Sequence, residues 1–220
     1  MYCKLGIDPL HLLINSYITQ TLFMKKSILL FLTGISFMAA SAQIQFGLKA
    51  GANFAMLTGS GVTGAKTLVG FHGGGLVAIP LFMDFSLQPE VVYSGQGAKG
   101  TDDTGAEFKV TQNYLNVPVL FKWNHSSGFF AETGPQVGIL LSAKDKQGST
   151  TIDAKSAYNS TDFCWVFGIG YLINSANIGI DARYNLGLSN ISKYSSNGMT
   201  VKSSVIQVGL FYLFGEGKQK

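Results

Sequence analysis

Hydrophobic and polar residues alternate along most of the chain after residue 44. In the stretch FSLQPEVVYSG, which starts at Phe85, large apolar residues recur at every second position except at Pro89, and Glu90 lies on the opposite face. Alternation with a period of two is typical of a β-strand with one apolar and one polar face. The pattern predicts eight strands, near residues 44–56, 67–80, 84–97, 108–123, 128–143, 162–173, 177–190 and 201–214.

The connections between the predicted strands alternate in length. Three are short: IPLFMD at 79–84, NHSSG at 124–128 and NSAN at 174–177. The other four are longer and mostly polar, at 57–66, 97–107, 143–161 and 190–200. Short periplasmic turns and longer extracellular loops are typical of transmembrane β-barrels. We therefore expect an all-β fold over residues 43–214, an eight-stranded antiparallel up-and-down transmembrane β-barrel preceded by a signal peptide.

The two faces of the predicted strands differ in bulk. One face of the sixth stretch, for example, carries Phe163, Trp165, Phe167, Ile169, Tyr171 and Ile173. The opposite faces are small or polar, although Val205, Phe211 and Leu213 share the face of Gln207 in the last stretch. The interior of an eight-stranded barrel is just wide enough to be filled by side chains, so the bulky faces would overfill it. We expect these faces to contact lipid and Glu90 to point into the lumen.

Composition supports a membrane barrel. Charged residues make up only 13% of the chain, against a typical value of about 25%, and there are 27 glycines. No apolar run in residues 43–220 reaches the length of about 20 residues that a spanning helix needs. The composition therefore favours strands that face lipid over a soluble or helical membrane protein.

The N-terminal region is typical of an export signal. From Met24 the sequence has two lysines, a short apolar core and the small-residue site Ala40-Ser41-Ala42. We interpret residues 24–42 as the signal peptide and residues 1–23 as a spurious extension before the true start. Cleavage is expected after Ala42. N-terminal mass mapping of the membrane-isolated protein tests this prediction, and recovery of intact residues 1–42 would contradict it.

Removal of residues 1–42 changes the charge and the cysteine content. The segment contains Lys4, Asp8, Lys25 and Lys26, so the formal net charge falls from +4 to +2. No basic patch indicates nucleic-acid binding. Cys164 is then the only cysteine, which excludes an internal disulfide.

Six charged residues lie on the predicted lumen faces. Three cations, Lys49, Lys122 and Arg183, balance three anions, Glu90, Glu132 and Asp181. The polar residues His72, Gln88, Gln136 and Gln207 share these faces. Buried ions are costly unless they are paired, so we expect a structural network that plugs the lumen. The alternative is a path for protons or solutes, or a gate whose ion pairs exchange partners.

No catalytic, metal or cofactor site is predicted. His72 is interpreted as polar filling of the lumen and His125 as a residue of a tight turn, too close in sequence to Ser126 and Ser127 for a convincing triad. Asp102 and Asp103 lack the spacing of a calcium loop, and the glycines at 73–75 lie inside a strand with no helix after them. We therefore expect the protein not to be an enzyme.

Several motifs resemble those of the outer-membrane β-barrel families of Bacteroidetes, known as porin family or PorT-like. They are FGLKAGANFAML, FSLQPEVVYSGQGAK, YLNVPVLFKW, FFAETGPQVGILLSAK and NIGIDARYNLGLSNI. The resemblance implies an outer-membrane location, contact with outer-membrane lipid and assembly by the insertion machinery. One departure is that the short polar tail GEGKQK, residues 215–220, follows the terminal aromatic Phe214.

The expected function is structural or interaction-based, with a polar lumen plugged by charge. A protein partner would bind through the extracellular loops, and we expect a monomer. The alternatives are a small-solute porin or an accessory component of a secretion system, as the PorT resemblance implies. An outer-membrane enzyme is the least favoured class.

Overall fold

The computed structural model describes residues 44–60, 62, 64–101, 105, 107–148, 150–194 and 200–215. The predicted signal peptide, residues 24–42, the segment before it and residues 216–220 of the tail lie outside this part of the chain. Within it, no helix is long and apolar enough to cross a membrane. The elements are β1 (Gln45–Thr58), β2 (Ala65–Pro80), β3 (Phe85–Thr101), β4 (Glu107–Asn124), β5 (Phe129–Gln147), β6 (Thr150–Asp153), the 3-10 helix η1 (Lys155–Ala157), β7 (Thr161–Ile173), β8 (Ile178–Gly187) and β9 (Lys202–Phe214).

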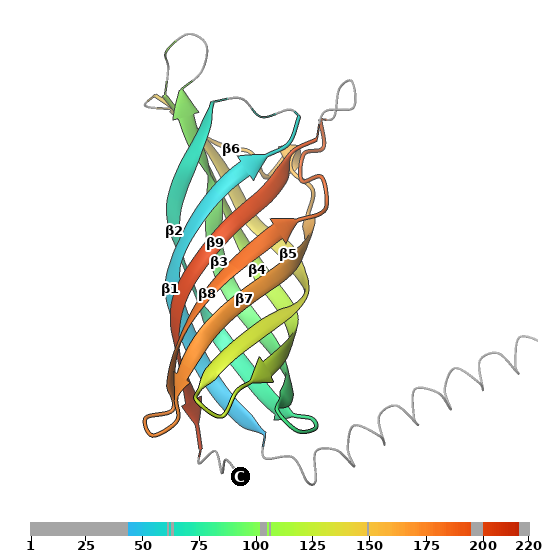
Figure 1. Cartoon of the computed structure of the whole chain (residues 1–220). Coiled ribbons are helices and arrows are strands. Elements are labelled where there is room, and N and C mark those ends of the chain that lie inside the picture. Colours follow the sequence, from blue (N-terminus) through green and yellow to red (C-terminus); the bar gives the residue numbers. More distant parts are fainter. Residues whose placement is uncertain are drawn as a thin grey trace, which may run out of the picture. The chain divides into compact units, whose positions relative to one another are not determined.

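Eight of these strands close into an antiparallel barrel. Hydrogen-bonded neighbours follow the order β4-β3-β2-β1-β9-β8-β7-β5, and the β4–β5 pairing completes the ring. The strands are tilted, and the short turns β2–β3, β4–β5 and β7–β8 lie at the same end as the start of β1 and the end of β9 (Figure 1). The predicted eight-stranded barrel is confirmed, with short turns at one end and long connections at the other.

The largest departure from the expected strands lies in the segment 143–161, which was expected to be a loop. There β5 continues to Gln147, and the four-residue strand β6 pairs with its end, with Lys144 opposite Asp153. All four residues of β6 are exposed. Because both faces of this hairpin are exposed, its residues show no apolar alternation that could have indicated a strand. At the other long connections β3 extends to Thr101, and β8 ends earlier than expected, at Gly187.

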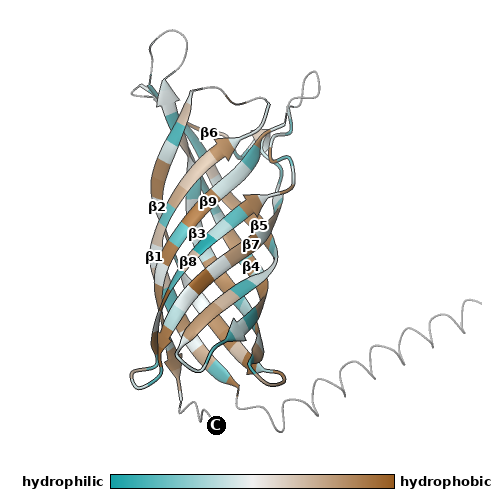
Figure 2. Ribbon diagram, viewed as in Figure 1, coloured by the Kyte–Doolittle hydropathy of each residue, from teal (hydrophilic) through white to brown (hydrophobic). Residues whose placement is uncertain are grey.

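The outer surface of the barrel is apolar. Large hydrophobic side chains on the outward faces are exposed, including Phe167 and Ile169 of β7, while the positions between them are buried or half-buried. Hydrophobic residues recur along all the barrel strands (Figure 2). This arrangement confirms the predicted outward orientation of the bulky faces, because these side chains would be costly to expose to water but suit a lipid environment.

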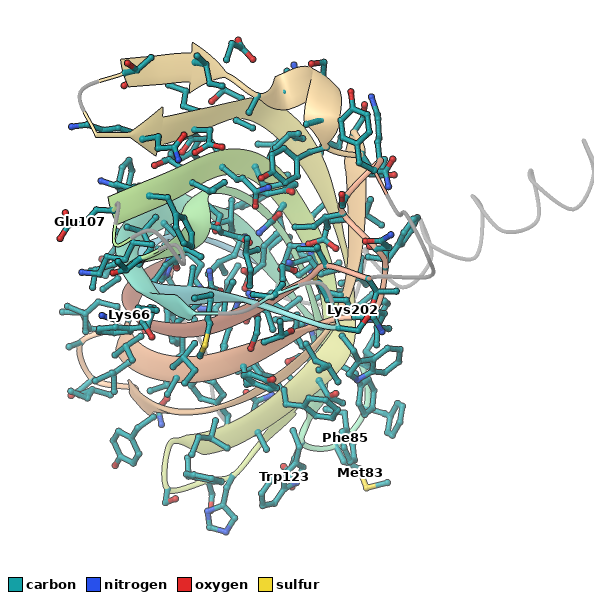
Figure 3. All side chains as sticks on the ribbon, turned by 90° about the horizontal axis from the view of Figure 1, so that it is seen from above. Lys66, Met83, Phe85, Glu107, Trp123 and Lys202 are labelled. Atoms are coloured by element: carbon teal, nitrogen blue, oxygen red, sulfur yellow. The ribbon has the colours of Figure 1, made fainter. Side chains whose placement is uncertain are left out.

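Aromatic side chains gather at the short-turn end of β3 and β4. Phe85 lies opposite Trp123 in the register, and the Phe85 ring stacks on Phe121 with 5.0 Å between ring centroids. Phe85 and Trp123 lie on the same side of the barrel, with Met83 of the turn beside them (Figure 3). Aromatic girdles lie at both membrane–water interfaces of transmembrane barrels, so these rings mark one edge of the membrane span. We take this end as the periplasmic one because the short turns lie there.

Glycines make room for large side chains inside the narrow lumen. A Cβ on Gly170 would overlap the ring of Phe130, and one on Gly179 would overlap the ring of Phe211. Phe130 and Phe211 are fully buried and pack edge to face, 5.8 Å apart. The small residues of β7 and β8 therefore provide the space that the two rings fill.

Replacing Gly179 with alanine is expected to lower the free energy of unfolding by about 1–3 kcal/mol, because overpacking forces the Phe211 ring to move. Urea unfolding in lipid vesicles measures the change. Gly75→Ala is a matched control, since a Cβ there meets nothing closer than the Gly47 carbonyl oxygen at 3.8 Å. Adding Phe211→Leu to Gly179→Ala should recover part of the loss. Equal costs for the two alanine variants would contradict the packing argument.

Candidate functional site

Arg183 of β8 lies at the centre of a buried ion cluster in the lumen. Its Nη1 and Nη2 atoms donate to the two carboxylate oxygens of Glu90, each over 2.8 Å. Its Nε donates to Glu132 Oε1, and Nη2 lies 3.2 Å from Asp181 Oδ2. The guanidinium thus joins carboxylates from β3, β5 and its own strand, and its planar fork suits the bidentate contact with Glu90.

Lys49 of β1 completes this cluster. Its Nζ donates to Asp181 Oδ2 over 2.9 Å and lies 3.6 Å from Glu90 Oε2. None of the five side chains is more than 3% exposed. We call this set, Lys49, Glu90, Glu132, Asp181 and Arg183, the charged layer. It contains two cations and three anions.

A glycine explains how Arg183 reaches Glu132. In the register, Glu132 of β5 lies opposite Gly168 of β7, and Gly168 lies opposite Arg183 of β8. Because Gly168 has no side chain, the two charged side chains meet across the intervening strand. A Cβ on Gly168 would come within 2.8 Å of Glu132 Oε1 and 3.0 Å of Arg183 Cγ.

Lys122 does not enter the charged layer, although the sequence grouped it with the other lumen charges. Its Nζ donates to Gln88 Oε1 over 3.2 Å, and Gln88 Nε2 in turn donates to Glu90 Oε1 over 2.7 Å. The ammonium also lies 3.5 Å from the centroid of the Phe130 ring, a cation–π contact. Lys122 is therefore linked to Glu90 through Gln88, although its backbone lies directly opposite Glu132 in the register. The Glu132 carboxylate accepts from Arg183 Nε instead.

Polar side chains continue above the charged layer, toward the extracellular end. Asn53 Oδ1 accepts from Gln207 Nε2 over 2.9 Å and lies 2.8 Å from His72 Nδ1. Asn53 Nδ2 donates to Ser94 Oγ over 2.9 Å. Gln136 is also buried, opposite Cys164 of β7. Of the four polar residues that the sequence indicated, His72 and Gln207 meet on Asn53, Gln88 bridges Lys122 to Glu90, and Gln136 lies apart from these contacts.

An apolar layer lies on the periplasmic side of the charged layer. Its buried members are Leu76, Phe130, Phe211 and Leu213, with Leu172 packed against them. The mixed character of the last strand indicated Phe211 and Leu213 from the sequence, whereas Phe130 on β5 was not singled out. Together the two layers fill successive levels of the lumen.

A further buried carboxylate, near the extracellular end, was missed by the sequence analysis. Asp162 of β7 accepts from Ser203 Oγ and from Ser189 Oγ, the latter over 2.8 Å. Cys164 Sγ lies 3.4 Å from Asp162 Oδ2. The strand alternation already placed Asp162 on the lumen face, next to Cys164, but its serine partners on β9 and in the β8–β9 connection have no local sequence signal.

Two histidines lie within the described residues, one in the lumen and one in a turn. His72 is buried, and its Nδ1 contacts an amide oxygen, not a carboxylate. His125 Nδ1 lies 2.8 Å from Ser127 Oγ in the exposed β4–β5 turn, a contact that closes the turn locally. No group of three or more histidine, cysteine, aspartate or glutamate side chains in the described ranges could hold a metal ion. Asp102 and Asp103 lie outside those ranges.

Comparison with known families gives a match over most of the chain. The family model described as "Outer membrane protein beta-barrel domain" matches residues 36–193. A search of curated proteins finds no match.

Solved outer-membrane proteins are similar at low sequence identity. Neisserial surface protein A is 18% identical, with a TM-score of 0.48 over 77% of this chain and 97% of that one. Ail, the attachment invasion locus protein of Yersinia pestis, is 15% identical, with a TM-score of 0.45 over 77% and 98%. The E. coli outer membrane protein W is 12% identical, with a TM-score of 0.35 over 77% and 97%.

Proposed function

Because the chain belongs to the outer membrane protein beta-barrel domain family and is located in the bacterial outer membrane, we propose that it is a membrane-anchored scaffold with a closed lumen. Its role is structural or interaction-based, and its working surface is the extracellular end of the barrel. The charged layer, which spans the lumen from β1 to β3, β5 and β8, is the observation that carries this proposal.

Opening the lumen would require the charged layer to come apart. Separating a buried carboxylate from Arg183 leaves an uncompensated charge, which costs several kcal/mol per ion. The apolar layer adds Phe130 and Phe211, whose rings fill the space left by the glycines of β7 and β8. Since an eight-stranded interior is only wide enough for its own side chains, the two layers leave no room for a wide aqueous channel.

The extracellular end supports an interaction role. There β3, β4 and β5 continue past the apolar face with polar residues that lie opposite one another. The short strand β6 pairs with the end of β5 (Figure 1). A partly apolar depression of about 350 Å³ lies among the long connections. Leu57, Phe108, Tyr158, Tyr194 and Val201 are among its lining residues. A protein partner that binds through these connections could contact the apolar side chains of the depression and the polar side chains at the surrounding strand ends.

Conductance in planar bilayers tests the closed lumen. The purified protein is expected to give no stepwise currents. A variant with Glu90→Ala, Arg183→Ala and Phe211→Ala serves as the positive control, because it removes a matched ion pair and one ring of the apolar layer, and it should conduct. Stepwise currents from the unchanged protein would overturn the proposal and favour the small-solute porin.

The remaining hypotheses follow from the sequence. They are an affiliation with the PorT-like proteins of Bacteroidetes, an accessory role in secretion, assembly by the outer-membrane insertion machinery and a monomeric state. The proposal assigns the protein no catalytic activity. Co-purification of the tagged full chain from its native membrane tests the accessory role, which predicts stoichiometric recovery of other envelope proteins.

A further inference from the structure

Four lysines form a row across neighbouring strands at the extracellular end of the barrel. Lys66 of β2 lies directly opposite Lys99 of β3, Lys99 opposite Lys109 of β4, and Lys109 opposite Lys146 of β5. All four side chains are exposed. We call this set the lysine row.

The lysine row is unfavourable for the protein alone. Directly opposite residues on a sheet have Cβ atoms about 4.5–5.5 Å apart, and like charges in that position destabilise the pairing. The register of the closed barrel places three such lysine pairs side by side on the neighbouring strands β2, β3, β4 and β5. Within the described ranges, none of the four lysines takes part in an ion pair or a hydrogen bond. An arrangement of this kind is balanced when an anion lies between the ammonium groups.

The side chains of the row point away from the lumen. Lys109 shares the outward face of β4 with Leu115, Val117 and Val119. Directly opposite residues on neighbouring strands point to the same side of a sheet, so the other three lysines of the row also point outward. Lys66 projects from the barrel on the same side as Glu107 (Figure 3). The row therefore faces the surroundings of the barrel, not a solute inside it.

The row lies just outside the apolar band. Lys99 follows Tyr93, the last large apolar residue on its face, by six residues, and Lys66 precedes Val69 by three. With a rise of about 3.3 Å per residue and a strand tilt of about 40°, these offsets place the row roughly 8–15 Å beyond the band. Lysine side chains can extend back toward the membrane, which brings their ammonium groups into the headgroup region.

We propose that the lysine row binds the phosphate groups of anionic lipids in the outer leaflet. An ammonium group is a strong partner for phosphate, and a row of four can hold more than one phosphate oxygen without a defined pocket. The surface between the strands is hollowed by a depression of about 410 Å³, which Lys66, Lys99, Lys109 and Lys146 line. Glu107 is the one carboxylate in this lining, so the depression is strongly positive.

The test uses the full chain in phosphatidylcholine nanodiscs, into which phosphatidic acid is titrated. A Lys99→Gln, Lys109→Gln variant removes the two central charges of the row. A Lys155→Gln, Lys193→Gln variant is the matched control, because it removes two exposed lysines that lie outside the row. The row variant is expected to bind phosphatidic acid more weakly by roughly fivefold for each lysine removed, whereas the control keeps nearly the affinity of the unchanged protein.

Two further measurements complete the test. In phosphatidylcholine alone, the row variant should be at least as stable as the unchanged protein, because repulsion across the strands is relieved. A loss of stability there would instead show that the lysines pair with carboxylates of the protein, and would overturn the proposal. Equal losses of lipid affinity in both variants would also overturn it. If soluble inorganic phosphate binds the row as tightly as the lipid does, the ligand is free phosphate and the lipid assignment is wrong.

Discussion

Arg183→Gln is expected to lower the free energy of unfolding in lipid vesicles by about 3–5 kcal/mol, the cost of breaking a buried ion pair by removing one partner. Arg183 contacts three carboxylates and is 3% exposed. Its loss leaves Lys49 as the one cation of the charged layer, beside three carboxylates. Uncompensated negative charge in the lumen is the physical reason for the large effect.

A second substitution distinguishes this network from a simple loss of packing. Glu90→Gln alone should also destabilise the barrel clearly, because it leaves Arg183 and Lys49 with one carboxylate fewer. In the Arg183→Gln background, however, Glu90→Gln removes a charge that has lost its bidentate partner and keeps only the longer contact with Lys49. The double variant should therefore be more stable than the sum of the two single changes predicts. Residues of one network show such non-additivity.

Lys202→Gln provides the control for the double-mutant cycle. Lys202 lies at the extracellular start of β9, opposite Thr58, and away from the charged layer. Its effect should add to that of Glu90→Gln without coupling. Strictly additive effects of Glu90→Gln and Arg183→Gln would contradict the proposed pairing of these two residues. A nearly neutral effect of Glu90→Gln would contradict the closed-lumen interpretation.

Ile169→Arg is expected to destabilise the barrel by about 2–4 kcal/mol, the cost of an arginine on the lipid face near the bilayer midplane. Ile169 is 55% exposed on the outward face of β7, between Phe167 and Tyr171. In the register it lies opposite Ala131 and Ala182, so the larger side chain meets no clash within the sheet. The cost therefore reports on the lipid environment.

Thr161→Arg is the matched control for the lipid face. Thr161 is exposed at the extracellular end of the same strand, with the same outward parity. Because the cost of arginine falls to about 0–1 kcal/mol near the interfaces, this variant should be nearly neutral. Unfolding in vesicles of phosphatidylcholine measures both. Equal stability of the two arginine variants would count against Ile169 lying at the membrane centre.

Sequence alone predicted the elements of the barrel well because their signal is local. A strand between lipid and lumen has two environments of opposite polarity, so alternation in β7 or β4 marks both the strand and its orientation. The same pattern ended where both faces of a strand are exposed, and for that reason β6 and the extended end of β5 went undetected. The extended end of β3 alternates exposed Lys99 and Thr101 with buried Ala98 and Gly100, which are too small to give a clear apolar signal. Glu90, Glu132, Asp181 and Arg183 could be assigned to the lumen by parity alone.

The contacts inside the lumen depend on quantities that no local pattern contains. Whether Arg183 meets Glu132 depends on the stagger of β5, β7 and β8 and on the absence of a side chain at Gly168. The register places Lys122 directly opposite Glu132, yet its ammonium lies over the Phe130 ring and the Glu132 carboxylate accepts from Arg183.

The chain by itself therefore determined which residues face lipid and which face the lumen, because that choice is made residue by residue at a period of two. Only the tertiary structure decided which charges meet, since partners such as Arg183 and Glu90 lie 93 positions apart. The lysine row has the same origin. Its members are dispersed between positions 66 and 146, and the closed register alone brings them side by side.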